Sequence, residues 1–233
     1  MEVGCDKTGV RGKMTREEIR DDFRTENPEI TTRVITDDTL NLWMKKANRE
    51  ICAETRCIVT NVSETFNTVA NTQYYDLEAR IDNFFDVDDM PGGGVYYNDV
   101  PLEKTSPSEL NSSHRLWRSN TAGTPKKWFL RGKYLWFDKK PNAAQDVDVD
   151  CVLIPNDFDA DAKEPFNELG YLQVYSDGIS KYLQWRCKAK VGKQEEAAIA
   201  QKAFHEYTAW MKKLVRSAKA SAIFRRPSSY PYR

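Results

Sequence analysis

The sequence lacks the features of a membrane or secreted protein. No apolar run approaches the roughly 20 residues that a membrane-spanning helix needs, so we expect no membrane partner. Residues 1–13 are polar and hold no apolar stretch of the signal-peptide kind, so we expect no secretory leader. The cysteines are odd in number and without a CxxC pair, which favours free thiols in a reducing compartment. They are Cys5, Cys52, Cys57, Cys151 and Cys187.

Residues suited to catalysis are also scarce. The two histidines, His114 and His205, have no neighbours at the spacing of a metal site or a Cys-His pair. The glycine-rich stretch Met90–Gly94 is followed by neither Lys-Ser/Thr nor a helix start, so it predicts a hairpin tip rather than a phosphate site. Carboxylate pairs such as Asp88-Asp89 fit no recognisable acid/base frame. We therefore predict that the protein is not an enzyme and uses no cofactor.

One acidic cluster has the spacing of a metal-binding loop. Asp157, Asp159 and Asp161 precede Glu168, and together they match the carboxylate spacing of a calcium-binding EF-hand. However, Ala162 stands where the loop needs glycine, Pro155 stands where the entering helix should be, and Pro165 interrupts the loop itself. We therefore predict no metal, and interpret the cluster as a solvated acidic linker with calcium as the weaker alternative.

Two long helices are predicted at the C-terminal end. From Glu168 to Ala189 apolar residues recur at intervals of three and four: Leu169, Leu172, Val174, Tyr175, Ile179, Tyr182, Leu183 and Trp185. A second helix is predicted over Lys193–Ile223, with Ile199, Ala203, Tyr207, Trp210, Leu214 and Val215 as its apolar face. The short joint at Gly192 predicts an antiparallel helical hairpin. Most of the aromatics should pack between helices, and four are candidates for a subunit interface: Tyr182, Trp185, Tyr207 and Trp210.

The last ten residues, 224–233, have no helical period and contain two prolines. A disordered terminus is one interpretation. The other is an anchor, because aromatic residues and arginines carry binding energy when a partner buries them. The candidate anchor residues are Phe224, Arg225, Arg226, Tyr230, Tyr232 and Arg233. Residues 181–233 contain thirteen Lys or Arg against three Glu, whereas the whole chain balances at 35 against 35, so the charge is segregated along the sequence.

The N-terminal part is predicted to be helical and the middle part to be β-rich. Thr15 and Glu18 form a capping-box pattern, which predicts a short helix to about Arg24. Thr36 or Asp37 should cap a longer helix with an apolar face of Leu40, Trp43, Met44, Ala47 and Ile51. Short strands are then predicted within Ile58–Asn67, Tyr74–Leu77, Asn83–Asp88, Gly94–Tyr97, Val100–Lys104, Trp128–Phe137 and the alternating run Asp146–Leu153.

These elements predict an α+β fold. Its parts are a flexible arm (1–13), N-terminal helices of a helical bundle stem (14–56), a β-rich insertion (57–155), a C-terminal helical hairpin of the stem (156–223) and an extended anchoring tail (224–233). The spacing of the short strands suggests that the insertion is an antiparallel sandwich or barrel.

The middle of the chain resembles tailed-bacteriophage head-to-tail adaptor proteins, also called connector or head completion proteins. The resemblance covers roughly residues 15–190 and consists of many weak matches. They are Tyr74-Tyr75-Asp76-Leu77, Phe84-Phe85-Asp86-Val87, Val95-Tyr96-Tyr97-Asn98-Asp99-Val100-Pro101-Leu102, Ser108-Glu109-Leu110, Trp117, Gly123-Thr124-Pro125, Trp128-Phe129, Tyr134-Leu135-Trp136-Phe137-Asp138, Lys140-Pro141 and Ile154-Pro155. The chain departs from the pattern at Asp76-Leu77-Glu78, where the usual proline is missing.

This resemblance implies a structural virion protein made in the host cytoplasm and located at the head–tail junction. Such a protein docks on the portal as a ring, commonly of about twelve copies, extends the DNA channel and connects to other tail or adaptor proteins. The resemblance also implies that residues 224–233 insert into or along the portal.

Another class remains open. A nucleic-acid-binding protein could use the basic terminal helix, with Lys202, Lys212, Lys213, Arg216, Lys219, Arg225 and Arg226 neutralising phosphates. An enzyme such as a nuclease or a glycan-cleaving β protein has only the acidic clusters in its favour.

Overall fold

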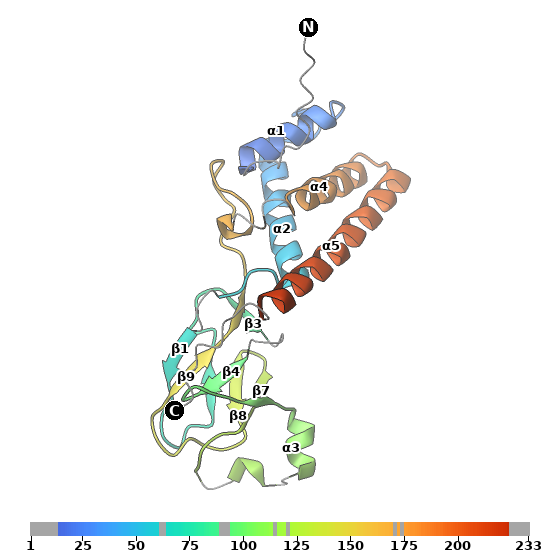
Figure 1. Cartoon of the computed structure of the whole chain (residues 1–233). Coiled ribbons are helices and arrows are strands. Elements are labelled where there is room, and N and C mark those ends of the chain that lie inside the picture. Colours follow the sequence, from blue (N-terminus) through green and yellow to red (C-terminus); the bar gives the residue numbers. More distant parts are fainter. Residues whose placement is uncertain are drawn as a thin grey trace. The chain divides into compact units, whose positions relative to one another are not determined.

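The computed structural model describes residues 14–60, 64–88, 94–113, 116–119, 122–169, 172 and 175–223, with side chains described up to residue 217. The chain divides into two compact units. A helical unit lies within residues 1–58 and 155–215, and a β unit contains residues 59–154 (Figure 1). The predicted α+β class is confirmed, with five α-helices in the described part of the chain. None of these helices combines the length and apolar character needed to cross a membrane.

The first two helices begin where the sequence indicates. They are α1, Arg16–Glu26, and α2, Asp37–Thr55. Thr15 caps α1 in a capping box, because the Glu18 carboxylate accepts the Thr15 backbone N–H at 2.8 Å while the Thr15 hydroxyl oxygen accepts the Glu18 N–H. Thr36 caps α2, and Arg56 ends it with a φ of 55°. The predicted apolar face of α2 is buried as expected: Leu40, Trp43, Met44, Ala47 and Ile51.

The next long helix, α4 (Asp177–Lys190), begins later than predicted. Apolar spacing predicted a start at Glu168, but Phe166, Asn167 and Glu168 all have positive φ angles, of 55°, 56° and 60°. A right-handed helix cannot include such residues, so they form the separate short turn η2 (Phe166–Glu168). Spacing alone does not reveal a left-handed stretch inside an apolar pattern.

The last helix, α5 (Gln194–Ile223), begins where predicted, after a turn in which Gly192 has a φ of 81°. The segment Tyr175–Lys190, which includes α4, contacts α5 in reverse order: residues late in the first segment meet residues early in α5. The contacts join Lys188 to Glu196 at 3.0 Å, the rings of Tyr182 and Phe204 at 5.2 Å, and the rings of Tyr175 and Trp210 at 5.9 Å. The two helices therefore run antiparallel.

The predicted apolar face of α5 is largely wrong. Ile199 is 71% exposed, Trp210 48% and Leu214 36%. The buried face consists instead of Ala197, Phe204, Thr208, Met211 and Val215, of which only Val215 belongs to the prediction. The apolar residues of α5 occupy two arcs of the helix, and the arc that holds Phe204 packs against the aromatic rings of α4.

The described residues of the β unit form ten short strands in three sheets. The strands are β1 (Glu64–Asn67), β2 (Tyr74–Asp76), β3 (Phe84–Val87), β4 (Val95–Tyr97), β5 (Val100–Pro101), β6 (Glu103–Lys104), β7 (Lys127–Arg131), β8 (Tyr134–Phe137), β9 (Asp146–Val149) and β10 (Cys151–Leu153). The strand orders are β1-β9-β4-β5, β10-β3 and β2-β8-β7-β6. Every pair is antiparallel except β6 and β7, which are parallel. These strands do not close into a barrel, so the barrel alternative is wrong.

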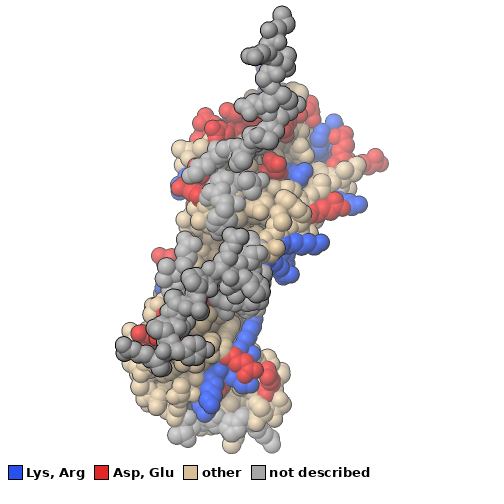
Figure 2. All heavy atoms as spheres, in the orientation of Figure 1, with Lys and Arg blue, Asp and Glu red and all other residues tan. Residues whose placement is uncertain are grey.

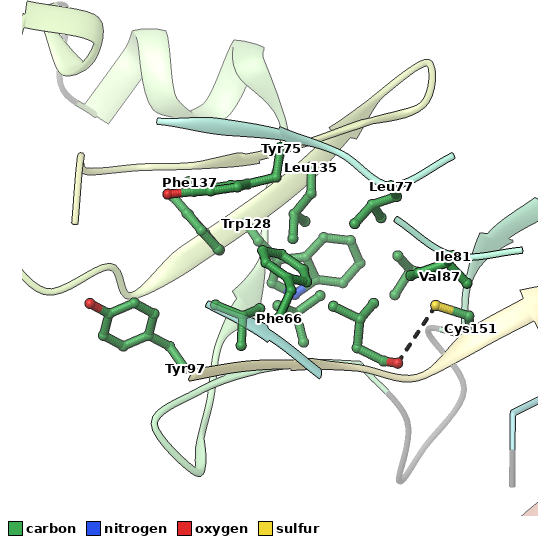
Figure 3. Packing of buried hydrophobic residues seen from close by; sticks show 13 residues of the cluster. Phe66, Tyr75, Leu77, Ile81, Val87, Tyr97, Trp128, Leu135, Phe137 and Cys151 are labelled. Atoms are coloured by element: carbon green, nitrogen blue, oxygen red, sulfur yellow. Dashed lines mark hydrogen bonds between the residues drawn. The ribbon is translucent and has the colours of Figure 1, made fainter. Parts of the chain in front are cut away.

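The two four-stranded sheets contribute to one core (Figure 3). One supplies Phe66, Val95, Tyr97, Val147 and Val149, and the other Tyr75, Trp128, Leu135 and Phe137. The ring of Phe137 lies 5.7 Å from that of Tyr75 and 6.3 Å from that of Tyr97, which joins the sheets through aromatic contacts. The predicted alternation over Asp146–Leu153 is confirmed at Val147, Val149 and Cys151. It is wrong at the end of the run, where Val152 is also fully buried and Leu153 only half-buried, because the strand register shifts between these two residues.

The sheet β2-β8-β7-β6 carries a helical cover on its other face. α3 (Pro107–Ser113) and the short turn η1 (Trp117–Ser119) supply Leu110 and Trp117, which pack on Phe129. Several predictions lie outside the described residues: the arm 1–13, the hairpin tip apart from Gly94, His114 and the tail 224–233.

Candidate interaction surfaces

The acidic loop before η2 is bound to α1 through Asp161. One carboxylate oxygen of Asp161 lies 2.7 Å from Nη2 of Arg16 and 3.1 Å from Nη1 of Arg20. Arg16 is only 9% exposed and also donates to the backbone carbonyl of Phe158 at 3.3 Å. Hydrogen bonds from both guanidinium groups lower the pKa of Asp161. The carboxylate therefore fixes the loop to the first helix.

The other carboxylates of the loop contact different cations. Asp157 lies 2.8 Å from Lys45 and 2.9 Å from Arg49, both on α2, and the hydrogen bond from Lys45 lowers its pKa. Asp159 lies 3.1 Å from Lys163, which lowers its pKa in the same way. Within the described residues no group of three His, Cys, Asp or Glu could hold a metal ion. The loop ties the helices together through separate ion pairs.

The four aromatic residues predicted for a subunit interface differ in exposure. Tyr182 is buried, and its ring contacts that of Trp185 at 5.3 Å. Trp185 and Tyr207 are half-buried, and the Tyr207 ring lies 5.3 Å from that of Trp210. Burial raises the pKa of Tyr207 well above its usual range. Of the four, only Trp210 is exposed, at 48%.

Trp210 belongs to an apolar surface that we call the outer stripe, formed by Ile199, Trp210 and Leu214. At about 100° per residue these side chains lie within about 60° of one another around α5, away from its buried face. Lys202, Lys213 and Arg216 are exposed along one side of the stripe, and we call them the cationic edge. Neither Lys213 nor Arg216 makes an ion pair with a residue that the structure describes.

The opposite charge gathers on α1. Its acidic face consists of Glu18, Asp21, Asp22 and Glu26, which are exposed and follow helical spacing. The buried side of the same helix carries Ile19 and Phe23. Acidic side chains are visible over the α1 end of the helical unit in Figure 2. The helical unit thus carries an acidic surface on its first helix and a basic, apolar surface on its last.

Comparison with known families decides the class of protein. Residues 14–227 match the family described as SU10 adaptor protein. The chain belongs to this family. The match confirms the resemblance to tailed-phage head-to-tail adaptor proteins. A comparison with curated proteins finds no match.

Membership of the SU10 adaptor family makes the chain a structural phage protein and a virion component. The matched residues include all the described elements of both units. The acidic face of α1 and the outer stripe of α5 therefore both lie within the part of the chain that defines an SU10 adaptor.

The β unit of this SU10 adaptor has a recess of about 620 Å³ beside β4 and β5. Its lining includes Tyr97, Pro101, Leu102, Pro125, Lys126 and Asn142. Lys126 is the one charged residue in the lining, and most of the rest are apolar or carry amides. Such a lining is suited to contact with another apolar or amide-bearing surface.

The cysteines of this SU10 adaptor that the structure describes are free and buried: Cys52, Cys57, Cys151 and Cys187. This agrees with the expected free thiols, whereas Cys5 lies outside the described residues. Burial raises the pKa of Cys151 and of Cys187 to about 12, which keeps both thiols protonated at neutral pH. They act as small apolar core residues.

Proposed function

We propose that this adaptor assembles as a ring on the portal, extends the DNA channel and connects the head to other tail or adaptor proteins. The observation that carries the proposal is the family match over residues 14–227. A ring of about twelve copies would have each subunit present one surface to each neighbour. The head–tail junction of the virion is the proposed location, and the host cytoplasm is the proposed place of synthesis.

The tail, residues 224–233, is the proposed anchor on the portal. Its candidate contact residues are Phe224, Arg225, Arg226, Tyr230, Tyr232 and Arg233. Aromatic and arginine side chains are enriched among the residues that dominate binding energies, which favours an anchor over a solvating terminus. The family match extends into the beginning of this segment, to residue 227.

The solution mass of the chain tests the ring. Light scattering should be measured on the chain alone and then with the portal of the same phage. We expect a complex with a fixed ratio of adaptor to portal subunits. A chain that fails to join the portal under any condition would contradict the proposed docking.

Deletion of residues 224–233 tests the anchor. The shortened chain should keep its helical circular dichroism spectrum and lose portal binding. A second variant keeps the length and charge of the tail but replaces its aromatics, as Phe224→Ser, Tyr230→Ser and Tyr232→Ser, and it should also lose portal binding. Equal binding by the deleted and intact chains would show that the anchor lies elsewhere.

One observation favours nucleic-acid binding as a second candidate function. Lys202, Lys212, Lys213 and Arg216 occupy an arc of about 100° on α5, a pattern that can follow a phosphate backbone. Binding of free duplex DNA that falls steeply with salt, and weakens in Lys213→Glu, would support it. DNA binding that is absent at low salt would exclude it.

A further inference from the structure

We propose that the outer stripe of α5 and its cationic edge bind a second copy of this chain, and that the surface they meet is the acidic face of α1 on that copy. The inference rests on the proposed ring and adds to it the two surfaces that join neighbouring subunits. Each copy would use α5 toward one neighbour and α1 toward the other.

The α5 side of this contact is apolar and positively charged at once. Ile199 is 71% exposed and Trp210 48%, although both belong to a well-formed helix whose other side is fully packed. Lys213 and Arg216 follow Trp210 within two turns of the helix and are exposed, without an ion pair among the described residues. Apolar side chains rimmed by cations form a typical protein-binding surface, because the centre loses water while the rim selects the partner.

The α1 side offers the complementary charge. Glu18, Asp21, Asp22 and Glu26 are exposed along one face, and Arg20, beside this face, lies 3.9 Å from Asp21. Between α1 and α2, Val34 is an exposed apolar residue, at 46%. This combination suits the cationic, apolar α5 surface.

The charges favour a head-to-tail contact over a symmetric one. A two-fold contact between the α5 faces of two copies would bring two cationic edges into one interface, and a contact between the α1 faces would bring carboxylates together. Pairing α5 with α1 avoids both repulsions. A contact between two different surfaces of the same chain repeats from copy to copy, and it closes into a ring when the rotation between copies allows it.

The same surface is less suited to nucleic acid. Phosphates would pair with Lys202, Lys213 and Arg216 but would leave the outer stripe exposed to water. Glu206 also lies within this region of α5, 3.8 Å from Lys202, and a carboxylate repels phosphates. The observations therefore favour a protein partner, and DNA binding becomes an outcome of the test.

Charge reversal with rescue tests the proposal. One variant reverses the cationic edge, as Lys213→Glu with Arg216→Glu, and another reverses the acidic face, as Asp21→Lys with Glu26→Lys. The matched control reverses two exposed carboxylates outside both faces, as Glu54→Lys with Asp82→Lys. Sedimentation velocity at low salt should show self-association for the wild type and the control and its loss in both test variants.

Mixing then distinguishes a head-to-tail contact from a general charge effect. In a solution of one variant alone, every copy carries one reversed face and one intact face, and these two faces now have charges of the same sign. The contact between the two reversed faces is complementary again, and so is the contact between the two intact faces, so the mixture should recover association. A single chain that carries all four reversals should also self-associate.

Three results would overturn the proposal. The first is a wild type that stays monomeric at every concentration both with and without the portal. The second is self-association that neither pair of reversals changes. The third is loss of duplex DNA binding in the α5 variant while its self-association is unchanged. Portal docking is measured separately through the tail deletion. Failure of the subunit contact and failure of the proposed docking are therefore distinguishable.

Discussion

Gly178 on α4 is a residue for which even a methyl group has no room. A Cβ atom there would lie 2.8 Å from Cε1 of Tyr207 and 3.1 Å from Cδ1 of Ile51. Helix propensity favours alanine by about 0.5–1 kcal/mol, whereas overpacking costs about 1–3 kcal/mol. We expect Gly178→Ala to lower the free energy of unfolding by about 1 kcal/mol, measured by urea unfolding. Gly123→Ala, whose Cβ would meet only Lys139 at 3.5 Å, is the control. An equal loss of stability in both variants would contradict overpacking as the cause.

Asp161 makes the stability of the helical unit depend on pH in the acidic range. Its pKa is held below the ordinary 3.8 by Arg16 and Arg20, so the folded chain binds a proton there less readily than the unfolded chain. The resulting stabilisation is complete above about pH 4 and is lost as the pH falls through the lowered pKa. We expect Asp161→Asn to lower the melting temperature at neutral pH and to weaken its fall on acidification. Asp82→Asn, at an exposed site, should change neither the melting temperature at neutral pH nor its fall on acidification.

Residue patterns that act locally could be predicted from the sequence. The capping box of Thr15 and Glu18 involves neighbours along the chain, so its geometry follows from residue type and spacing. The left-handed φ angles of Phe166 and Asn167 could not be predicted, because neither residue is glycine and their conformation depends on contacts with distant segments. The Phe166 N–H, for example, donates to the side chain of Asn48 on α2 at 3.1 Å.

At the scale of elements, α5 shows how an amphipathic pattern can be misread. Its sequence supports a helix, and the helix ends where predicted. Its apolar residues, however, cover more of the circumference than a single packed face requires, so periodicity cannot tell the buried arc from the exposed one. Phe204 and Met211 are fully buried while Ile199 is exposed, and all three are apolar. The second apolar arc is the feature from which we propose the contact with another copy of the chain.

Substitutions on the two arcs of α5 should differ in their effect on stability. Phe204 is fully buried, with its ring 5.2 Å from that of Tyr182 and 6.1 Å from that of Trp185. Phe204→Ala should lower the free energy of unfolding by about 3–5 kcal/mol because it leaves a cavity. Ile199→Ala, at an exposed site, should change it by no more than about 0.5 kcal/mol. Chemical denaturation of the two variants in parallel tests this difference. A similar loss of unfolding free energy in both would mean that the outer stripe is packed within the subunit.

On the scale of the whole molecule, the class α+β and most strand positions follow from alternating and helical periods. The sheet orders do not, because pairing such as β1 with β9 joins segments far apart in sequence. The parallel pair β6 and β7 is another example, since a two-residue strand carries almost no pattern. The candidate anchor in the tail was predicted from composition and stays a prediction.

The β unit should fold without the helical unit. Its main core consists of residues within 59–154, including Trp128, Phe137 and Val147, and this length exceeds the roughly 40 residues below which domains usually need disulfides or metals. We expect an excised fragment of residues 59–154 to unfold cooperatively on heating and to show near-ultraviolet circular dichroism from its aromatic core. A fragment without either signal would mean that the helices are needed for its packing.

The points where the chain enters and leaves the β unit are paired with each other. Val59 forms an antiparallel bridge with Val152, and Thr60 exchanges hydrogen bonds with Cys151 at 3.0 and 3.1 Å. The segment between them therefore begins and ends at one place, as an insertion does in a host. Recombination between phage genomes could exchange the codons for this segment without shifting either flanking helix. Replacement of this one segment could then bring new partners, while the subunit contacts proposed for the helices are inherited unchanged.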